Sequence, residues 1–446
     1  MPVAPRRRAV TSRRRTELGL LILGGMVVGF AYVLASLGKT ASIPANVGPF
    51  LGVIFGLALV AHLANRWLVP DATPVILPIA ALLNGIGYVV IARLNFKLAG
   101  LQAVWTGLGV AVYVLTLVVV RYSRDLARYR YLVAFAGLAL LLVPLTPKLG
   151  QNINGARLWV RLGPVTFQPV ELAKIALIIF FASYFVEKRE LLTVPTVRIG
   201  NRLFTDPRPF GPVVLAWGFS LLVMTAERDV GFSLLIFVLF ISMLWMATGR
   251  VTYLVVGAVL FVIGAFVAAH LFGHVNDRIS VWLDPWRYAN GIGYQVVQSQ
   301  YAFGSGGLVG SGLGLGHPGL IPVASSDFIF AAIGEELGLL GTVGIVMAFL
   351  MLVGASLRTA LVAKSDFAKL LAAGITAAIG FQAFFIMAGV VRLLPLTGVT
   401  LPFVAYGGSS LLANYVLIAL LIRVSDENVQ QAVPPQADHR VAVAAG

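Results

Sequence analysis

The chain has 446 residues, of which 59% are hydrophobic and only 11% are charged, and its mean hydropathy is +0.91. Soluble domains carry about 25% charged residues, so this composition excludes an ordinary soluble protein and indicates one that is embedded in a membrane. The apolar runs last about 20 residues without two-residue alternation, which predicts helices and excludes a barrel. The sequence contains no cysteine, so disulfides and thiolate metal sites are excluded.

The apolar runs predict an all-α, polytopic fold of about twelve transmembrane helices, with ends placed to within about four residues. They lie at about 18–37, 48–69, 74–92, 99–120, 131–147, 168–186, 211–226, 230–248, 251–272, 328–357, 368–391 and 398–422. With a cytoplasmic N-terminus, 22 Lys and Arg residues fall inside, ten fall outside and Lys174 lies within a span. This positive-inside distribution explains the net charge of +15 without nucleic acid, and it places both termini in the cytoplasm.

Two outer connections are longer than simple linkers require. The first covers about 148–167, and the second, a large extracellular loop between spans nine and ten, runs from about 273 to 327. Loops of this length are functional or disordered, and the tryptophans and apolar residues here argue against disorder. We therefore expect a basic N-terminal segment, two N-terminal helices, a main membrane domain and a disordered cytoplasmic tail, at residues 1–17, 18–73, 74–426 and 427–446.

Three ionisable residues stand out at the outer ends of spans. Asp327 lies where the long loop enters an apolar helix, and a carboxylate at such a boundary is costly enough to suggest a function. Glu171 and Lys174 lie at i, i+3 after Pro169, so they can pair on one helix face. The pair is either an interfacial anchor or part of a polar cavity in which Lys174 meets an anionic substrate.

Other polar residues have weaker signals. The charged tip at 227–229 is either a solvated hairpin or part of a site, and the charged residues between 277 and 287 are expected to be mostly solvated pairs. At least one of Glu335 and Glu336 should face a polar interior. The five histidines lack metal-ligand spacing. The glycines at 310–316 follow no strand, so they predict flexible backbone near a ligand and exclude a nucleotide fingerprint.

Several motifs occur in a fixed order along the chain. They are Asn154–Trp159, Phe167–Lys174, Gly293–Gln295 with Gln298 and Ser299, Asp327–Phe330 with Gly334–Gly338, and Leu394–Gly398 with Pro402–Ser410. Together they resemble the SEDS (shape, elongation, division and sporulation) family, of the RodA and FtsW type, over about residues 74–426. Such a family member has a core of ten helices, and two extra N-terminal helices make this chain most similar to actinobacterial RodA-type members. The usual family residues are replaced at Val170, Glu227, Arg228, Ser325, Ser326 and Ala405.

The resemblance implies a peptidoglycan glycosyltransferase that polymerises lipid II into β-1,4 glycan strands at the outer face of the bacterial cytoplasmic membrane. A single inverting displacement needs a base at the attacking hydroxyl and positive charge at the leaving phosphates, and Asp327 is the expected base. The expected substrate-binding residues are Lys174, Glu171, Arg157, Trp159, Gln298, Ser299, Arg392, Ser409 and Ser410. Trp159 either stacks on a sugar or anchors the chain at the interface.

No cofactor is required by this chemistry, and Mg²⁺ or Mn²⁺ is an optional aid at the pyrophosphate. The resemblance implies as partners a class B penicillin-binding protein, which cross-links the strands, and other elongasome or divisome proteins. A lipid II flippase is the alternative function, since intramembrane charges fit transport as well. A third possible function is a scaffold that recruits other wall enzymes without catalysis of its own. The intact Asp327 argues against it, because a scaffold would not require that carboxylate. The sequence leaves open whether the chain serves cell elongation or division.

Overall fold

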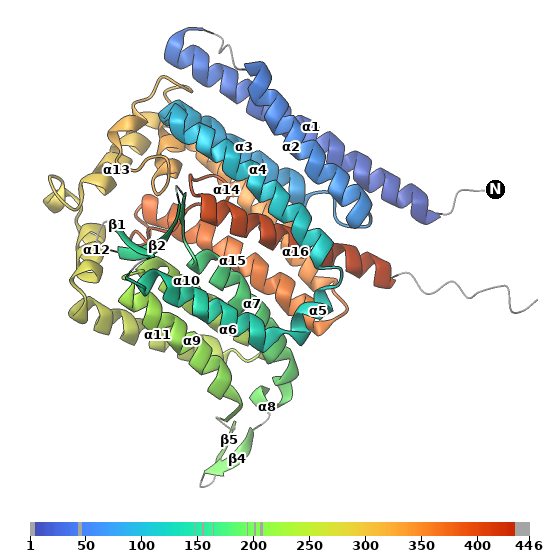
Figure 1. The fold of residues 1–446 in the computed structure, drawn as a ribbon. Helices are drawn as coiled ribbons and strands as arrows, with labels where there is room; N and C mark the ends of the chain where they lie inside the picture. Colours follow the sequence, from blue (N-terminus) through green and yellow to red (C-terminus); the bar gives the residue numbers. More distant parts are fainter. Residues whose placement is uncertain are drawn as a thin grey trace, which may run out of the picture.

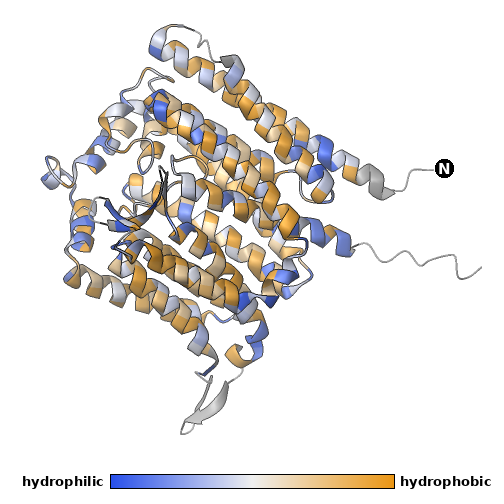
Figure 2. Ribbon diagram, viewed as in Figure 1, coloured by the Kyte–Doolittle hydropathy of each residue, from blue (hydrophilic) through white to orange (hydrophobic). Residues whose placement is uncertain are grey.

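The computed structural model describes residues 5–42, 47–147, 149–153, 156–163, 165–193, 195–199, 202–205 and 208–432. The described chain is a bundle of roughly parallel and antiparallel helices whose surfaces are largely apolar (Figures 1 and 2). In a bilayer every backbone polar group must be bonded internally, which long helices achieve on their own. The predicted all-α membrane fold is confirmed.

Four long helices form the N-terminal part: α1 (Pro5–Thr40), α2 (Val47–Leu68), α3 (Ile76–Leu94) and α4 (Phe96–Val119). Asn95 both ends α3 and caps α4, because its side-chain oxygen accepts the backbone N–H groups of Lys97 and Leu98 at 3.0 and 3.3 Å. Helices α1 and α2 run along the outside of the α3–α4 pair (Figure 1). They are therefore an addition at one edge of the bundle.

The middle of the chain combines helices with two small antiparallel sheets. Its elements are α5 (Ser123–Arg128), α6 (Arg130–Leu142), β1 (Gly150–Ile153), β2 (Ala156–Leu162), β3 (Val165–Phe167), α7 (Val170–Glu187), α8 (Arg189–Thr193), β4 (Pro195–Ile199), β5 (Arg202–Thr205) and α9 (Gly211–Ala226). Strand β2 is central in the β1–β2–β3 sheet, where Val160 is opposite both Gly150 and Phe167. This sheet lies near α12, whereas the β4–β5 hairpin projects at the other end (Figure 1).

The C-terminal part supplies the remaining helices. These are α10 (Val230–Thr248), α11 (Thr252–Leu271), α12 (Gly273–Leu283), α13 (Tyr294–Gly306), α14 (Ile329–Leu361), α15 (Asp366–Val390) and α16 (Gly408–Ala432), with short 3₁₀ turns at 286–288 and 318–320; two more turns, at 143–145 and 208–210, lie in the middle of the chain. The predicted long outer loop therefore contains two helices, α12 and α13. Both lie at the same end of the bundle as the β1–β3 sheet (Figure 1).

The core lies around α7, α15 and α16. Every residue of α7 from Val170 to Phe185 is buried except Leu172, and 83% of the most apolar window of α16 is buried. A helix that is hydrophobic all round belongs in the interior. The opposite case is α11, where only 6% of that window is buried, so its apolar side chains face the surrounding lipid or a partner.

Nine helices in the described ranges are long and apolar enough to cross a membrane. Three further helices, α6, α7 and α9, are shorter or carry more charge, and they occupy the remaining predicted spans. The last predicted span began too early: residues 398–407 are irregular, with positive φ at Gly398 and Phe403, and α16 starts only at Gly408. Apolar composition alone did not distinguish this buried loop from a helix.

Hydrogen bonds to distant segments hold the chain near both of its ends. Helix α1 begins at Pro5, and its inner end is held where Arg13 donates to the carbonyl of Asp71 at 2.5 Å. Helix α16 continues to Ala432, because Asn428 donates to the carbonyl of Thr359 at 2.9 Å. The disordered tail predicted at 427–446 was therefore wrong for residues 427–432. Residues 433–446 lie outside the described part of the chain.

Candidate active site

Asp327 is placed by a tight turn at the entrance of α14. The backbone N–H groups of Ser326 and Phe328 both bond to the carbonyl of Val323, at 3.1 and 3.5 Å, and Phe328 is fully buried as an anchor. The N–H of Tyr406 bonds to the carbonyl of Ser325 at 2.9 Å, which ties this turn to the irregular segment before α16. The carboxyl group is thus held on rigid backbone, at the end of the bundle that carries α12 and α13.

The surroundings of Asp327 make it a better base than an ordinary aspartate. It is half-buried, and burial raises the pKa of its carboxyl above the usual 3.8, while Arg278 and a hydrogen bond from Ser326 oppose that rise. A general base works best when its pKa approaches the working pH. The balance between burial and Arg278 therefore keeps Asp327 ionisable but more basic than it would be in water.

Arg278 is the functional candidate that sequence reasoning missed, since it was expected to be one of several solvated pairs in the long loop. Helix α12 instead carries it inward, where its guanidinium donates to the carbonyl of Leu396 at 2.7 Å. Its charge acts on both Asp327 and Asp229. A Cβ at Gly398 would lie 3.5 Å from the guanidinium, an ordinary contact, so the φ of +74° rather than lack of space favours glycine there. No sequence motif marks this arginine; only the direction of α12 does.

The sequence left open whether the charged tip at 227–229, between α9 and α10, is a solvated hairpin or part of a site. The structure shows that it is not a solvated hairpin. Glu227 and Asp229 are 2% and 7% exposed, and only Arg228 between them reaches the surface, with φ at +63°. Burial raises the pKa of Glu227 to about 8, with a further contribution from Asp229. Burial likewise raises the pKa of Asp229 to about 6, although that side chain caps α10 by accepting the N–H of Phe232 at 3.0 Å.

The Glu171–Lys174 pair is fully buried below this tip. The Lys174 amine donates to Glu171 and to the Gln382 side chain, both at 2.7 Å, and it lies 5.7 Å from the ring centre of Phe232. Gln382 in turn donates to the carbonyl of Thr400 at 3.0 Å. In this conformation Lys174 has no surface to offer a substrate, and it neither snorkels to the interface nor lines an open cavity. The pair instead joins α7 to α15.

A cavity of about 100 Å³ adjoins Arg278 at the outer end of the bundle. Two cationic side chains, Arg278 and Arg392, line it, together with Trp282 and Gln295. Arg392 is held with φ at +65°, donates to the carbonyl of Leu283 at 3.2 Å and accepts at its own carbonyl from the Trp282 indole at 3.2 Å. Arg392, which the sequence predicted as a substrate contact, thus lines the same cavity as Arg278, whose charge acts on Asp327.

The two glutamates early in α14 hold the glycine-rich stretch in place. Glu336 pairs with Arg93 at 3.0 Å and accepts the N–H of Gly314 at 3.1 Å, while Glu335 accepts the N–H of His317 at 2.7 Å. The expectation that at least one of them faces polar groups is met by both. Gly310 and Gly314 approach protein backbone closely: at Gly314 a Cβ would collide with the outer end of α1.

The remaining predicted site residues fall into two groups. Ser299, Ser409 and Ser410 are buried; Ser299 bonds to the carbonyl of Val296 at 2.8 Å, and Ser409 accepts the N–H of Gln168 at 2.8 Å. All three serines bond to other parts of the protein: Ser299 also donates to the carbonyl of Val390 on α15 at 3.4 Å, and Ser410 accepts from Asn414 of its own helix at 3.4 Å. The side chains that keep some exposure are those of Arg157, Trp159 and Gln298.

Strand β2 brings Arg157 and Trp159 to the outer end of the bundle. The N–H of Arg157 bonds to the carbonyl of Glu227 at 3.3 Å, so the strand crosses the buried tip between α9 and α10. The first two residues of the Asn154–Trp159 motif lie outside the described residues. In the described part of the chain, no group of three or more His, Asp or Glu side chains is placed to hold a metal ion.

The chain is similar to a known protein family and to several known proteins. The family model for cell cycle proteins of the FtsW, RodA and SpoVE type matches residues 76–430. The chain is 41% identical to the peptidoglycan glycosyltransferase RodA of Mycobacterium tuberculosis over 93% of its own length and 91% of the relative's. It is 38% identical to a probable peptidoglycan glycosyltransferase FtsW of a Geobacter species, over 64% of this chain and 76% of that one.

Two solved structures share the fold. One comes from a study of how a peptidoglycan synthase complex coordinates polymerisation and cross-linking, with a TM-score of 0.64, 26% identity and coverage of 79% of this chain and 97% of that chain. The other is RodA of Thermus thermophilus, with a TM-score of 0.59, 24% identity and coverage of 81% of this chain and 99% of that one. Helices α1 and α2 precede the residues that the family model matches.

The fold and the outer-end site define a multi-pass membrane enzyme with a buried polar centre. The chain belongs to the SEDS family of FtsW, RodA and SpoVE, and its enzyme class is peptidoglycan glycosyltransferase.

Proposed function

We propose that this chain polymerises lipid II into β-1,4 glycan strands, with Asp327 as the general base. The 4-hydroxyl oxygen of one disaccharide forms a bond to the anomeric carbon of another, and the bond from that carbon to the lipid pyrophosphate breaks. The hydroxyl proton passes to the Asp327 carboxylate, and the electron pair leaves with the pyrophosphate. The α-linked donor becomes a β linkage in one inverting step, so no covalent enzyme intermediate is needed.

The observation that carries this proposal is the position of Asp327 beside Arg278. A base and a cation within electrostatic reach of each other are the two groups that the displacement requires. Arg392 lines the same small cavity as Arg278 and supplies a second positive charge for the pyrophosphate. Arg157 and Trp159 on β2 retain exposed surface for the sugar or the phosphates. Glu171 and Lys174 support the site from below, as a positioning pair.

The proposal includes a location for the enzyme. The basic residues concentrate on the side that carries α5 and α8, so we place that side and both termini in the cytoplasm, and Asp327 on the outer face of the cytoplasmic membrane. A relative of the same fold was solved in a synthase complex that also cross-links, which supports a separate class B penicillin-binding protein as partner. The similarity to RodA over 93% of the chain supports a role in elongation rather than division.

The test is polymerisation of purified lipid II in detergent by the Asp327→Asn variant. Asparagine keeps the shape of the side chain and removes the base, so we expect a loss of about 10²- to 10⁴-fold in rate. Asp284→Asn is the matched control, because Asp284 is an exposed carboxyl at the end of α12 whose role is to accept the N–H of Arg287. It should stay within about twofold of the wild type.

Wild-type rates from Asp327→Asn, with normal thermal unfolding, would overturn the assignment. The alternative flippase is tested in the same experiment. Detergent provides no second leaflet, so a protein that only moves lipid II across a bilayer makes no glycan strands there. Strands made by the wild type and by Asp284→Asn, and not by Asp327→Asn, support the polymerase.

A further inference from the structure

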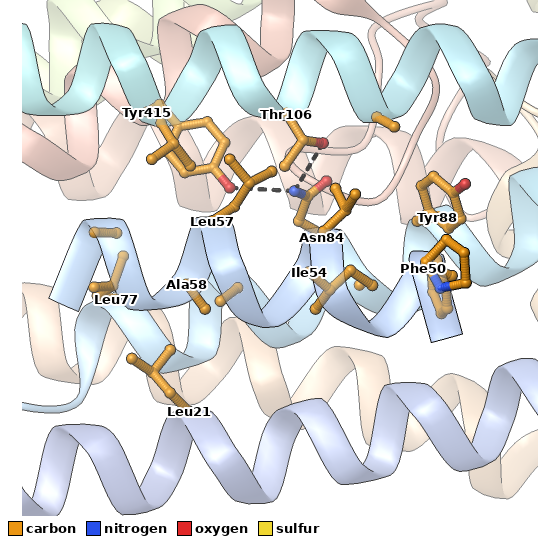
Figure 3. Close-up of a pocket in the computed structure, with 17 residues that line it drawn as sticks. Leu21, Phe50, Ile54, Leu57, Ala58, Leu77, Asn84, Tyr88, Thr106 and Tyr415 are labelled. Carbon is orange, nitrogen blue, oxygen red and sulfur yellow. Dashed lines mark hydrogen bonds between the residues drawn. The ribbon is translucent and has the colours of Figure 1, made fainter. Parts of the chain in front are cut away.

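A cavity away from Asp327 lies among the membrane-spanning helices. It has a volume of about 250 Å³ and is enclosed by α2 on one side and by α3, α4 and Tyr415 of α16 on the other, with Leu21 of α1 at one end (Figure 3). Interiors of proteins are normally packed without voids larger than a water molecule. A space of this size between helices therefore calls for an occupant.

The packing of α1 explains why the cavity exists. A Cβ at Gly25 would collide with the Phe55 ring, and one at Gly29 would lie 2.8 Å from Leu51, so α1 holds α2 closely through these two glycines. On its other face α1 contacts α3, where a Cβ at Gly85 would lie 2.5 Å from Val28. Both α2 and α3 are fixed to α1, while the space between α2 and the α3–α4 pair stays open as a slot.

Both ends of the slot are closed. At the outer end Tyr32, Phe50 and Tyr88 stack, with ring centres 4.0 and 4.8 Å apart. Beyond the inner end the Glu17 carboxylate bonds to the His62 ring at 2.8 Å in a buried polar cluster. The slot thus runs along α2 from about 50 to about 61, which is roughly 16 Å at 1.5 Å per residue.

The chemistry of the wall excludes an ion or a lipid headgroup inside the slot. No charged side chain lines it within the described residues, and its few polar groups lie along one side. There the Asn84 amide donates to the Thr106 and Tyr415 hydroxyls, both at 3.2 Å (Figure 3). Apolar cavities of about 150 Å³ stay free of water and take up small apolar molecules. Apart from the Asn84 side-chain oxygen, which has no hydrogen-bond partner among the described residues, the lining of this larger cavity is mainly apolar and suits hydrocarbon.

The slot also has an entrance. Val53 is 49% exposed although it lines the cavity, and Pro49 beside it is exposed as well, so the outer half of the slot opens sideways along α2. The hydrocarbon core of a bilayer is about 30 Å thick, so roughly 16 Å corresponds to one leaflet. A slot of one-leaflet length with a lateral mouth matches a single hydrocarbon chain entering from the lipid.

We propose that the slot between α2 and the α3–α4 pair is a binding site for one hydrocarbon chain of a lipid. In the proposed orientation the chain belongs to the outer leaflet, with its headgroup outside the slot near Pro49. Either an acyl chain of a bilayer phospholipid or a polyprenyl chain has the required chemistry. The site is independent of Asp327 chemistry, and one of its walls, α2, is supplied by the helix pair that precedes the family core.

Photo-crosslinking tests the site directly. The full-length protein is reconstituted in vesicles of phosphatidylethanolamine and phosphatidylglycerol that contain either a phosphatidylglycerol with a diazirine in one acyl chain or a diazirine-bearing polyprenyl phosphate. Labelled positions are mapped by peptide mass spectrometry and normalised to α11, of which only 6% of the most apolar window is buried. We expect labels on the slot walls of α2, α3 and α4 from at least one probe, and which probe labels them identifies the source of the chain.

Two variants fill the slot from opposite walls, Ala58→Phe on α2 and Ala103→Phe on α4. The control is Ala111→Phe, the same change at an exposed position of α4 that is not in the lining. Loss of even two methylene groups from the slot lowers its occupancy about tenfold, so wall labelling should fall by at least that factor in both filling variants and stay unchanged in the control. Thermal unfolding shows which variants are folded. Absence of wall labels from both probes, or labels that persist in a folded filling variant, would overturn the site.

Discussion

Arg278 provides the sharpest test of the electrostatic balance at the active site. It is the cation that acts on Asp327 in the described part of the chain, opposing the effect of burial on the pKa of that carboxyl. An opposite charge nearby lowers a carboxyl pKa by about 1 to 3. Replacing Arg278 by alanine should therefore raise the pKa of Asp327 by that amount. Arg278→Lys keeps the charge and should raise it much less.

The sign of the effect on activity follows from the role of the base. Only the carboxylate accepts a proton, so activity is lost as the pH falls through the pKa of Asp327. A higher pKa moves this acid limb to higher pH, and at a pH below both pKa values the rate falls about tenfold for each increase of 1 in the pKa. Arg278→Ala also removes the charged hydrogen bond to Leu396, which should lower the folding stability by about 1.5–3 kcal/mol at every pH.

The assay is glycan-strand formation from lipid II in detergent between pH 5 and 9, with kcat/KM measured at each pH. A purely structural role for Arg278 lowers activity evenly across this range, whereas the electrostatic role moves the acid limb of Arg278→Ala and leaves that of Arg278→Lys close to the wild type. Coincident acid limbs for Arg278→Ala and wild type, in folded protein, would refute the reasoning.

Two further predictions concern the buried charges beside the site. Because burial raises the pKa of Glu227 from 4.5 to about 8, the folded state binds more protons than the unfolded state between these values, and stability falls as the pH rises through them by up to about 1.4 kcal/mol per pH unit. Glu227→Gln should flatten this dependence in thermal unfolding scans at pH 5 to 9; an unchanged slope would contradict the burial argument. Lys174→Ala leaves the Glu171 carboxylate buried without its cation, which should cost about 3–5 kcal/mol of stability, and the double variant Lys174→Met, Glu171→Gln should recover most of it. A Lys174→Ala protein with normal unfolding but weakened lipid II binding would instead make Lys174 a direct substrate contact.

The functional residues that the sequence identified best are those whose positions depend only on local chain order. Asp327 was recognisable because a carboxylate at the boundary between a polar loop and an apolar helix has a desolvation cost, and the structure keeps it half-buried at that boundary. Glu171 and Lys174 were recognisable as a pair because i, i+3 spacing on a helix brings them together, and they lie 2.7 Å apart. Neither argument needed knowledge of distant segments.

Arg278 and the 227–229 tip were misjudged for the opposite reason. Their burial depends on segments far away in the chain. Arg278 donates to the carbonyl of Leu396, which is 118 residues away in the sequence, and the backbone N–H of Arg157 on β2 donates to the carbonyl of Glu227. Charged residues in loops are usually solvated, so local sequence favours the wrong interpretation. The serines at 299, 409 and 410 share this difficulty, because polarity alone does not distinguish a substrate contact from a hydrogen bond within the protein.

The sequence by itself determined the membrane fold, the approximate spans, the distribution of charge across the bilayer and the family, because hydrophobic length and motif order are properties of the chain alone. The tertiary structure decided what each polar group faces. It placed Lys174 beneath the site, brought Arg278 beside Asp327, and left a slot between α2 and the α3–α4 pair where glycines draw the neighbouring helices together. Burial and electrostatic fields are sums over neighbours from the whole chain, and only the packed helices define those neighbours.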